Sequence, residues 1–329
     1  MIRRAIGRNG RQVNAIGLGC MGMSFAYGPA LPETEAIALL HKAIDLGVDH
    51  FDTAEMYGLG HNERLLGAAF HDRREKVFIA TKFGPLMEAG TGRRLGVDGS
   101  EANARRAIEQ SLRFLQTDHV DLWYLHRRDF SRPIEETVGA MSRLVEEGKV
   151  KAIGLSEVTA PTLRAAAKVA PIAALQSEYS MFSRSIEADI LPACRETGTT
   201  LVAYSPLGRG ILTGAIKKDW KPEGMDFRAA MQPRYQGENF DANLALVAEI
   251  EAIAAEARAT PGQAALAWVL AQGDDVMVIP GTTKLANLQG NLAAADVTIS
   301  SAQMARLNAL AAKVQGERYD EAGMKAVNG

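Results

Sequence analysis

Four ionisable residues lie at or just beyond the ends of apolar segments. Asp52 closes one segment, Tyr57 follows five residues later, and Lys82 and His126 close the next two segments. A phenol is a weak acid with a pKa of about 10, and a nearby ammonium group favours its ionised form and lowers that pKa. A set of this kind suits delivery of a proton to a carbonyl oxygen while a hydride reaches the carbonyl carbon.

Each residue has a separate task in that chemistry. We expect Lys82 to lower the pKa of Tyr57, and Asp52 to pair with Lys82 and keep it charged. His126, donating a hydrogen bond from a neutral ring, would position the substrate oxygen. Taken singly, Asp52 also fits a helix cap and Tyr57 fits half-buried packing, but an unpaired lysine at the end of an apolar strand would be costly to bury.

The elements that must position these residues alternate along the chain. Short apolar runs indicate strands at 16–20, 48–53, 77–83, 120–126, 150–156, 172–177, 200–205 and 276–280. Amphipathic patterns indicate helices at 33–46, 61–72, 101–116, 134–147, 160–169, 186–197, 260–272 and 284–294. Eight strand–helix units predict an α/β fold of the (β/α)8 TIM-barrel type, whose catalytic groups lie at the carboxyl ends of the strands.

Further segments flank the predicted barrel, which covers 16–294. Residues 2–14 contain Asn9-Gly10, a strong turn signal, and predict a β-hairpin across the bottom of the barrel. The longest connection, 206–260, includes a helical pattern at 241–258, and 300–329 predict a C-terminal helix and tail. We therefore expect residues 1–329 to form a single domain. The loops 84–100 and 207–240 are the expected walls of a substrate site, with Trp123, Phe25, Tyr27 and Arg128 as possible rim contacts.

One motif has the letters of a dinucleotide-binding fingerprint. The residues from Gly17 to Gly22 match G-x-G-x-x-G, but that fingerprint requires the third glycine to open a helix. Here Pro29 and Pro32 precede any helical pattern. We expect a tight turn after the first strand instead, in which the backbone of Gly19, Cys20 and Met21 could approach a ligand closely.

Composition excludes several classes of protein. Among the 329 residues, 37 Lys and Arg balance 39 Asp and Glu, so there is no basic excess for binding nucleic acid. No apolar run approaches the roughly 18 residues of a membrane-spanning helix. Cys20 and Cys194 are too few for a disulfide framework or a zinc cluster. We expect a soluble, cytoplasmic protein that binds neither nucleic acid nor membranes.

A metal-dependent hydrolase of the barrel type is an alternative that needs several ligands at strand ends. His50 and Asp52 lie on one face of a strand and are two potential ligands. The remaining strand ends offer only His126, Ser156, Gln176, Ser205 and Pro280. We therefore expect no metal site.

Ordered motifs along the chain resemble those of the aldo-keto reductase superfamily. The segments DTAEMYG (52–58), ATKFG (80–84) and DLWYLH (121–126) are similar to the family's aspartate–tyrosine, lysine and histidine segments. They are followed in the family's order by GLSE (154–157), QSEYS (176–180), YSPLGRG (204–210), PRYQGEN (233–239) and IPGTTK (279–284). The resemblance extends over nearly the whole chain, to about Asn291.

The resemblance implies a reductase of small aldehydes or ketones that binds NADPH in an extended form. Asp52, Tyr57, Lys82 and His126 would be its catalytic tetrad, with Tyr57 as the general acid. The implied cofactor contacts are Ser156, Glu157 and Gln176 for the carboxamide, Tyr204 for the nicotinamide ring, Ser205, Pro206, Leu207, Gly208, Arg209 and Gly210 for the pyrophosphate, Gly281, Thr282, Thr283 and Lys284 for the 2′-phosphate, and Asn291 for the adenine.

Two residues depart from the pattern of the family. Glu157 replaces the more common asparagine, which weakens its assignment to the carboxamide. Asn287 occupies a position that often carries arginine near the adenine, so a preference for NADPH would depend largely on Lys284, Thr282 and Thr283. Some proteins similar to this family are regulatory or sensor subunits with slow turnover; the intact tetrad favours an enzyme.

Overall fold

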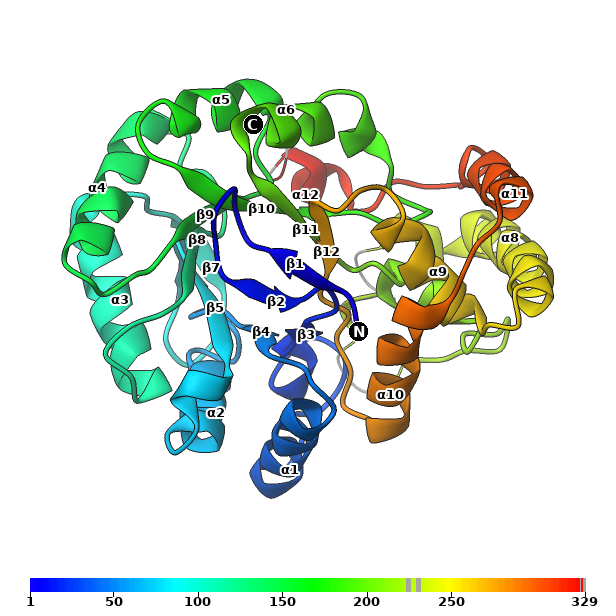
Figure 1. The fold of residues 1–329 in the computed structure, drawn as a ribbon, viewed down its shortest axis with the longest axis horizontal. Coiled ribbons are helices and arrows are strands. Elements are labelled where there is room, and N and C mark those ends of the chain that lie inside the picture. Colours follow the sequence, from blue (N-terminus) through cyan, green and yellow to red (C-terminus); the bar gives the residue numbers. More distant parts are fainter. Residues whose placement is uncertain (223–225, 229–231, 326, 328–329) are drawn as a thin grey trace.

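A closed ring of parallel strands forms the centre of the computed structural model, which describes residues 1–222, 226–228, 232–325 and 327. The strand order is β3, β4, β5, β8, β9, β10, β11, β12, and parallel bridges from Ile16 to Val278 and from Gly19 to Gly281 join the last strand to the first. The strands are Leu18–Gly19 (β3), His50–Asp52 (β4), Phe78–Phe83 (β5), Leu122–Leu125 (β8), Ile153–Ser156 (β9), Ile172–Glu178 (β10), Thr200–Tyr204 (β11) and Val276–Val278 (β12). The predicted (β/α)8 fold is confirmed (Figure 1).

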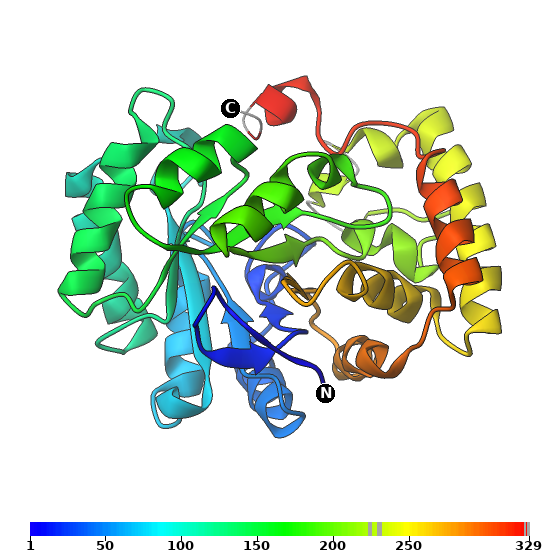
Figure 2. The same cartoon turned by 45° about the horizontal axis from the view of Figure 1, so that its top comes forward.

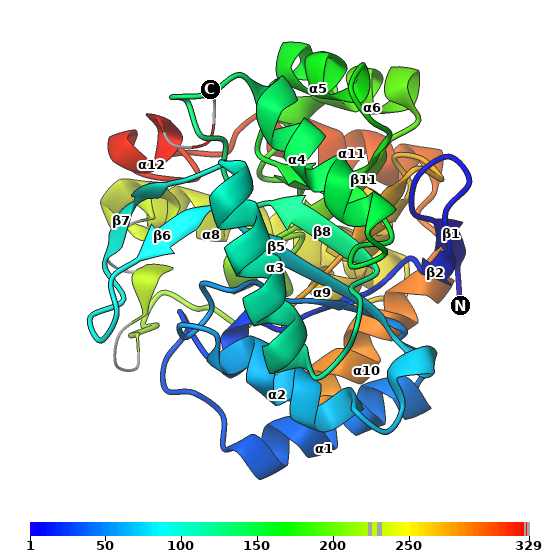
Figure 3. The same ribbon diagram turned by 90° about the vertical axis from the view of Figure 1, so that its left-hand side faces the viewer.

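Helices surround the strands on the outside of the barrel (Figure 3). They are Glu33–Asp45 (α1), His61–Phe70 (α2), Glu101–Leu115 (α3), Ile134–Glu146 (α4), Ala160–Ala167 (α5), Ile190–Thr197 (α6), Gly237–Glu256 (α8), Pro261–Leu270 (α9), Leu285–Ala293 (α10), Ser301–Ala311 (α11) and Glu321–Lys325 (α12). Capping side chains define where two of these helices begin. Thr260 and Gln263 form a capping box before α9, and Ser300 and Gln303 form one before α11, which supplies partners for backbone N–H groups at each start.

Alternation along the strands divides the core into two layers. Side chains that point outward, such as Ile79 and Trp123, pack against the helices, while neighbours such as Ala80 and Tyr124 point into the barrel. The inner layer also contains Ile6 from the N-terminal hairpin. Trp123 is fully buried and stacks on Phe83, with 4.2 Å between ring centroids, so its predicted place on the rim is wrong.

The N-terminal hairpin lies at the amino ends of the strands, as predicted. Its strands Arg3–Ala5 (β1) and Gln12–Asn14 (β2) pair antiparallel. The Arg4 side chain donates to the carbonyl of Leu270 at 2.9 Å, and the N–H of Gly7 donates to the Thr200 hydroxyl at 2.9 Å. These bonds close the bottom of the barrel, so the carboxyl ends of the strands form the open rim (Figure 2).

Two predicted loops contain more structure than expected. The segment 84–100 folds into an antiparallel hairpin of Pro85–Met87 (β6) and Arg94–Val97 (β7), whose short strands lack a clear alternating pattern. The predicted loop 207–240 lies partly outside the described residues, at 223–225 and 229–231, and includes the 3-10 helices η4 (Gly208–Thr213) and η5 (Pro233–Tyr235).

The chain returns to the open rim after α11 through what we call the C-terminal segment, residues 315–325 (Figure 2). Asn243 on α8 holds its start, because the amide of Asn243 donates to Gln315 O at 2.9 Å and accepts from Gln315 N at 3.0 Å. Arg234 donates to Gly316 O at 3.0 Å. The tail predicted from the sequence is therefore attached to the barrel near the predicted site.

Candidate active site

The four predicted catalytic residues meet at the carboxyl ends of β4, β5 and β8. The Lys82 ammonium donates to a carboxylate oxygen of Asp52 and, at 2.7 Å, to the carbonyl of Thr53. Lys82 is fully buried and Asp52 is 3% exposed, so the pair is removed from water. Parallel pairing of β4 with β5 aligns the two strand ends and brings the two side chains together.

Tyr57 lies next to Lys82, and His126 lies next to Tyr57. The Lys82 nitrogen lies 5.1 Å from the centroid of the Tyr57 ring. The rings of Tyr57 and His126 meet edge to face, with centroids 5.9 Å apart and an interplanar angle of 85°. The predicted convergence of these residues at one rim is present in the structure.

The loop that carries Tyr57 is fixed by one asparagine. Asn62, at the start of α2, donates to Cys20 O at 2.9 Å and accepts from the Thr53 hydroxyl at 2.6 Å. Gly58 and Gly60 have positive φ angles of 59° and 82°, which suit glycine and allow the sharp turn. Tyr57 is therefore held between β4 and α2 by the local sequence.

The protonation states follow from burial and from the neighbouring charges. Burial is the largest influence on Lys82 and would lower its pKa, but the charges and hydrogen bonds of Asp52 and Tyr57 together outweigh burial and raise that pKa. Burial, together with the charges of Arg127, Lys82 and Arg94, lowers the pKa of His126 well below its usual range. At neutral pH the site therefore holds an ammonium group beside a neutral imidazole.

The expected effect on Tyr57 is reversed. Burial raises the pKa of Tyr57 above its ordinary value, and the nearby Lys82 charge only reduces that rise. The prediction of a lowered pKa is wrong because it did not include the loss of hydration of the phenolate in a closed site. Tyr57 accordingly keeps its proton at neutral pH.

Three of the residues predicted for the nicotinamide lie on the neighbouring strands β9, β10 and β11, and one of them contacts the tetrad. The Gln176 amide donates to the second carboxylate oxygen of Asp52 at 2.8 Å. The Ser156 hydroxyl ends β9 and accepts from Arg127 at 3.2 Å. Tyr204 ends β11 and is half-buried, and its hydroxyl lies 2.9 Å from the hydroxyl of Tyr319.

Glu157 has a different partner from the one expected. Its two carboxylate oxygens accept from the Arg318 guanidinium at 2.7 Å each, and one of them also accepts from the N–H of Glu178 at 2.9 Å. Burial alone would raise the pKa of Glu157, but the hydrogen bonds and charge of Arg318 lower it. In this structure Glu157 binds the C-terminal segment.

The loop predicted for the pyrophosphate has unusual backbone angles. Ser205, Gly208, Arg209 and Gly210 all have positive φ, between 49° and 104°, and Pro206 and Leu207 form the turn between them. The Arg209 side chain turns inward, donating to Glu178 at 2.6 Å and to Arg318 O at 2.7 Å. Its charge is thus already balanced by a buried carboxylate.

Residues 281–291 comprise the loop before α10 and most of that helix. Gly281 pairs with Gly19, and the Thr282 hydroxyl accepts from Lys284 N at 3.0 Å. Lys284 is exposed and forms no ion pair with any described residue. Thr283 is half-buried, Asn287 is exposed and Asn291 is buried.

The G-x-G-x-x-G match covers the first strand, β3, and the turn that ends it, as predicted. Met21 begins a three-residue 3-10 helix (η1, Met21–Met23), and α1 begins only at Glu33. The N–H of Cys20 donates to Asp52 O at 2.9 Å, and that of Gly19 donates to Pro280 O at 3.3 Å. These bonds fix the turn against the barrel beside the tetrad.

Within the described residues, no group of three or more His, Cys, Asp or Glu is placed to hold a metal ion. His50 is fully buried, with its ring edge-on to Phe78 at 5.4 Å between centroids. No helix in the described part of the chain is long and apolar enough to span a membrane.

Comparisons with known proteins agree with this geometry. The model of the Aldo/keto reductase family matches residues 15–312. The chain belongs to the aldo/keto reductase family. Members of this family are oxidoreductases, and the general activity of the family is the reduction of carbonyl groups.

Three solved structures illustrate the similarity. Glycerol dehydrogenase AKR11B4 from Gluconobacter oxydans is 28% identical, with a TM-score of 0.87 over 97% of this chain and 98% of that one. The thermostable aldo-keto reductase Tm1743, solved with the inhibitor epalrestat, is 32% identical, with a TM-score of 0.77 over 94% and 100%. An aldo-keto reductase from Klebsiella pneumoniae, solved with NADPH, is 29% identical, with a TM-score of 0.75 over 97% and 99%.

Sequence reasoning missed the contribution of the C-terminal segment to this aldo/keto reductase. Arg318 and Tyr319 reach residues that end β9 and β11, although the sequence indicated only a polar tail. A signal was present: Glu157 and Glu178 end buried strands with no basic residue beside them in the chain. Buried carboxylates require cationic partners, and these come from distant segments.

Proposed function

We propose that this protein reduces an aldehyde or ketone to an alcohol with NADPH, and that Tyr57 is the general acid. The observation that carries the proposal is the buried Lys82 ammonium, which binds Asp52 and lies 5.1 Å from the ring of Tyr57, whose ring meets that of His126 edge to face. A phenol, a charged neighbour and a neutral imidazole in contact with one another support this assignment.

The chemistry of the rim fits NADPH. Ser156 and Gln176 would hold the carboxamide, Tyr204 would contact the nicotinamide ring, and Lys284 would bind the 2′-phosphate at the start of α10. The carboxylates of Glu157 and Glu178 are each neutralised by a buried arginine, so neither would repel an anionic cofactor. The NADPH in the Klebsiella pneumoniae relative supports the same assignment. When bound, NADPH supplies the hydride.

The proton path involves only residues of this chain. Tyr57 is protonated at neutral pH because burial raises its pKa, and the Lys82 charge stabilises the phenolate that remains after proton transfer to the substrate oxygen. His126 is neutral and donates an N–H to orient that oxygen. Asp52 keeps Lys82 charged through the reaction.

Replacement of the phenol hydroxyl tests the assignment of the acid. In Tyr57→Phe we expect kcat for aldehyde reduction to fall by about 10² to 10⁴ while the Kd for NADPH stays within about threefold. Consumption of NADPH and quenching of protein fluorescence on NADPH binding measure the two quantities. Normal turnover by this variant would contradict the proposed acid.

Replacement of one lysine tests the cofactor. Lys284→Ala removes a charge-assisted bond of about 1.5 to 3 kcal/mol, so the KM for NADPH should rise at least tenfold and that for NADH little. An equal rise for both cofactors would show that Lys284 does not contact the 2′-phosphate.

The alternative of a regulatory or sensor subunit predicts slow turnover. Mixing the NADPH complex with a panel of aldehydes in a single turnover distinguishes the two. Rapid oxidation of the bound NADPH supports the enzyme, and tight binding without oxidation supports the sensor.

A further inference from the structure

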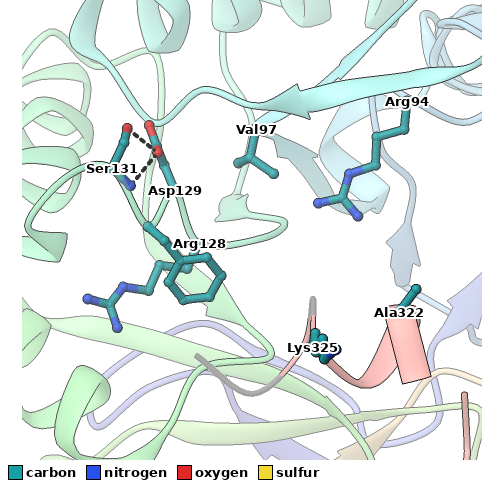
Figure 4. A pocket seen from close by; sticks show the side chains of 8 residues that line it. Arg94, Val97, Arg128, Asp129, Ser131, Ala322 and Lys325 are labelled. Atoms are coloured by element: carbon teal, nitrogen blue, oxygen red, sulfur yellow. Dashed lines mark hydrogen bonds between the residues drawn. The ribbon is translucent and has the colours of Figure 1, made fainter. Parts of the chain in front are cut away.

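A cavity of about 460 Å³ opens between the hairpin of β6 and β7, the loop after β8 and α12. Arg94 and Val97 from β7 form one wall, Arg128 and Phe130 from the loop after β8 form another, and Ala322 and Lys325 from α12 close the third (Figure 4). The cavity is open to solvent on its remaining side. A ligand can therefore enter without movement of the barrel.

The cavity adjoins the catalytic residues through the strands that end there. β5, which carries Lys82, leads directly into the hairpin of β6 and β7, and His126 directly follows β8. The N–H of Asp98 donates to Gly84 O at 2.9 Å, which brings the end of β7 against the end of β5. The charge of Arg94 also contributes to the lowered pKa of His126. A molecule with its carbonyl near Tyr57 can thus extend into this cavity.

Two arginines that line this opening, Arg94 and Arg128, have no carboxylate partner among the described residues. Within the part of the chain that the structure describes, Arg94 makes no hydrogen bond or ion pair, and Arg128 donates only to the Thr162 hydroxyl, at 3.0 Å. Arg127 donates to His126 O at 2.6 Å and to the Ser156 hydroxyl at 3.2 Å, and forms no ion pair with a described residue. It adds a further positive charge next to Arg128 in the chain.

The acidic side chains Asp129 and Glu321 near the cavity already have hydrogen-bond or ion-pair partners. Asp129 lines the cavity, but its oxygens accept from Gly99 N, Ser131 N and the Ser131 hydroxyl at 2.6 to 3.1 Å, and Arg132 lies at 3.3 Å. Glu321 pairs with Lys325 at 2.7 Å. The cavity thus keeps an excess of positive charge. By contrast Arg93, next to Arg94 in the chain, pairs with Glu88 at 3.0 Å.

Such a group of like charges favours an anion over water. Guanidinium groups match carboxylate and phosphate oxygens in pairs of parallel hydrogen bonds, and the apolar ring of Phe130, which is 55% exposed, offers contact for a carbon skeleton. We propose that this cavity binds the carboxylate or phosphate group of an anionic carbonyl substrate, with Arg94 and Arg128 holding the anion. The proposal rests on the proposed carbonyl reduction and names the class of its substrate.

Matched aldehydes test the proposal on the full chain. The anionic probes are 4-carboxybenzaldehyde and 4-formylphenyl phosphate, and the neutral probe is the methyl ester of the first. We expect kcat/KM to be at least about tenfold higher for one or both anions than for the ester, since a hydrogen bond to a charged group is stronger than one to a neutral group. The better anion identifies the group that the cavity binds.

Three variants test whether Arg94 and Arg128 cause the preference for anionic aldehydes. Arg94→Gln and Arg128→Gln should each lower kcat/KM for the preferred anion by about tenfold, mainly through KM, and leave the ester within twofold. Arg93→Gln is the matched control, because it removes a charge from the same hairpin that is already paired, and it should change neither substrate.

The outcomes separate the two proposals. Equal kcat/KM for anions and ester, or a loss in Arg93→Gln as large as that in Arg94→Gln, overturns the anion site and leaves carbonyl reduction in place. If no aldehyde is reduced, the proposed function fails. Calorimetry with 4-(hydroxymethyl)benzoate, the alcohol product, then tests the anion site separately. Binding that Arg94→Gln weakens at least about fivefold supports the anion site. Binding that is absent, or unchanged in this variant, overturns the anion site.

Discussion

Two buried ion pairs lie at the open end of the barrel and differ in what they connect. Lys82 and Asp52, with side chains 0% and 4% exposed, join the neighbouring strands β4 and β5. Arg318 and Glu157, 7% and 3% exposed, join the C-terminal segment to the end of β9, 161 residues away. Both pairs exclude water to a similar degree, so burial alone does not distinguish them.

The geometry of each cation separates the two roles. Lys82 presents a single charged nitrogen, which binds one oxygen of Asp52 and stays near Tyr57, so its charge can respond when the phenol loses a proton. Arg318 occupies both oxygens of Glu157 with a rigid fork, which leaves no proton to move and fixes position instead. One pair thus suits chemistry and the other suits attachment of the C-terminal segment.

The largest effect is expected from Lys82→Met. It removes the charge beside Tyr57, so kcat should fall by about 10² to 10⁴, and it leaves Asp52 buried without its cation, which costs about 3 to 5 kcal/mol of unfolding free energy. Steady-state kinetics and denaturant unfolding measure the two losses.

The double variant Asp52→Asn/Lys82→Met separates these losses. Without a buried unpaired charge it should regain most of the stability, but none of the activity. Recovery of activity together with stability would mean that the pair only supports the fold.

Arg318→Leu should instead lower stability with a smaller effect on chemistry. Glu157 loses its buried partner, so unfolding free energy should fall by about 3 to 5 kcal/mol and the C-terminal segment should become sensitive to protease. Because Tyr57, Lys82 and His126 are untouched, kcat should stay within about tenfold. A fall as large as that in Lys82→Met would remove the distinction between the two pairs.

Arg306→Leu on α11 provides the matched control. Arg306 pairs with Glu256 at 2.6 Å, but both side chains are about half exposed. An exposed pair contributes at most about 1 kcal/mol, so this variant should unfold nearly as the parent protein does. The difference in unfolding free energy between Arg318→Leu and Arg306→Leu then measures how much burial adds to the loss of an ion pair.

The same contrast explains which parts were predictable from the sequence. The barrel was predictable because each strand–helix unit is encoded locally, as in the capping box of Thr260 and Gln263. The convergence of Asp52, Lys82 and His126 followed from parallel strands with aligned ends. A charged residue at the end of a predicted parallel strand can therefore be placed at the rim of the barrel from the sequence alone.

Other features depended on contacts that no local pattern encodes. Nothing near Arg318 in the sequence indicates Glu157 as its partner, and the inward turn of Arg209 depends on Glu178. The raised pKa of Tyr57 depends on how completely the surrounding loops exclude water. The hairpin of β6 and β7 was missed because its strands have only three and four residues.

Glu63 shows what a buried carboxyl group does without a cation. Its one satisfied oxygen accepts from the Thr81 hydroxyl at 2.6 Å, and burial raises the pKa of Glu63 from 4.5 to about 7. A raised carboxyl pKa stabilises the protein at low pH, and that stability is lost as pH rises from about 4.5 to about 7. At about 1.4 kcal/mol per pKa unit, the loss is about 3 kcal/mol.

Glu63→Gln tests this sign by thermal or denaturant unfolding. The variant should gain up to about 3 kcal/mol relative to the parent protein at pH 8 and almost nothing at pH 4. A benefit of equal size at both pH values would show that Glu63 has the same pKa in the folded and the unfolded state, and that burial does not raise it.

The smallest effect concerns another contact of the C-terminal segment, between the hydroxyls of Tyr319 and Tyr204 at 2.9 Å. A hydrogen bond between neutral groups contributes about 1 kcal/mol, so Tyr319→Phe should lower unfolding free energy by about that amount, well below the loss in Arg318→Leu. Tyr204→Phe should lose the same amount, and the double variant little more, because both changes remove one bond. If the two losses instead add, the hydroxyls act independently, and the bond between Tyr319 and Tyr204 does not contribute to the attachment of this segment.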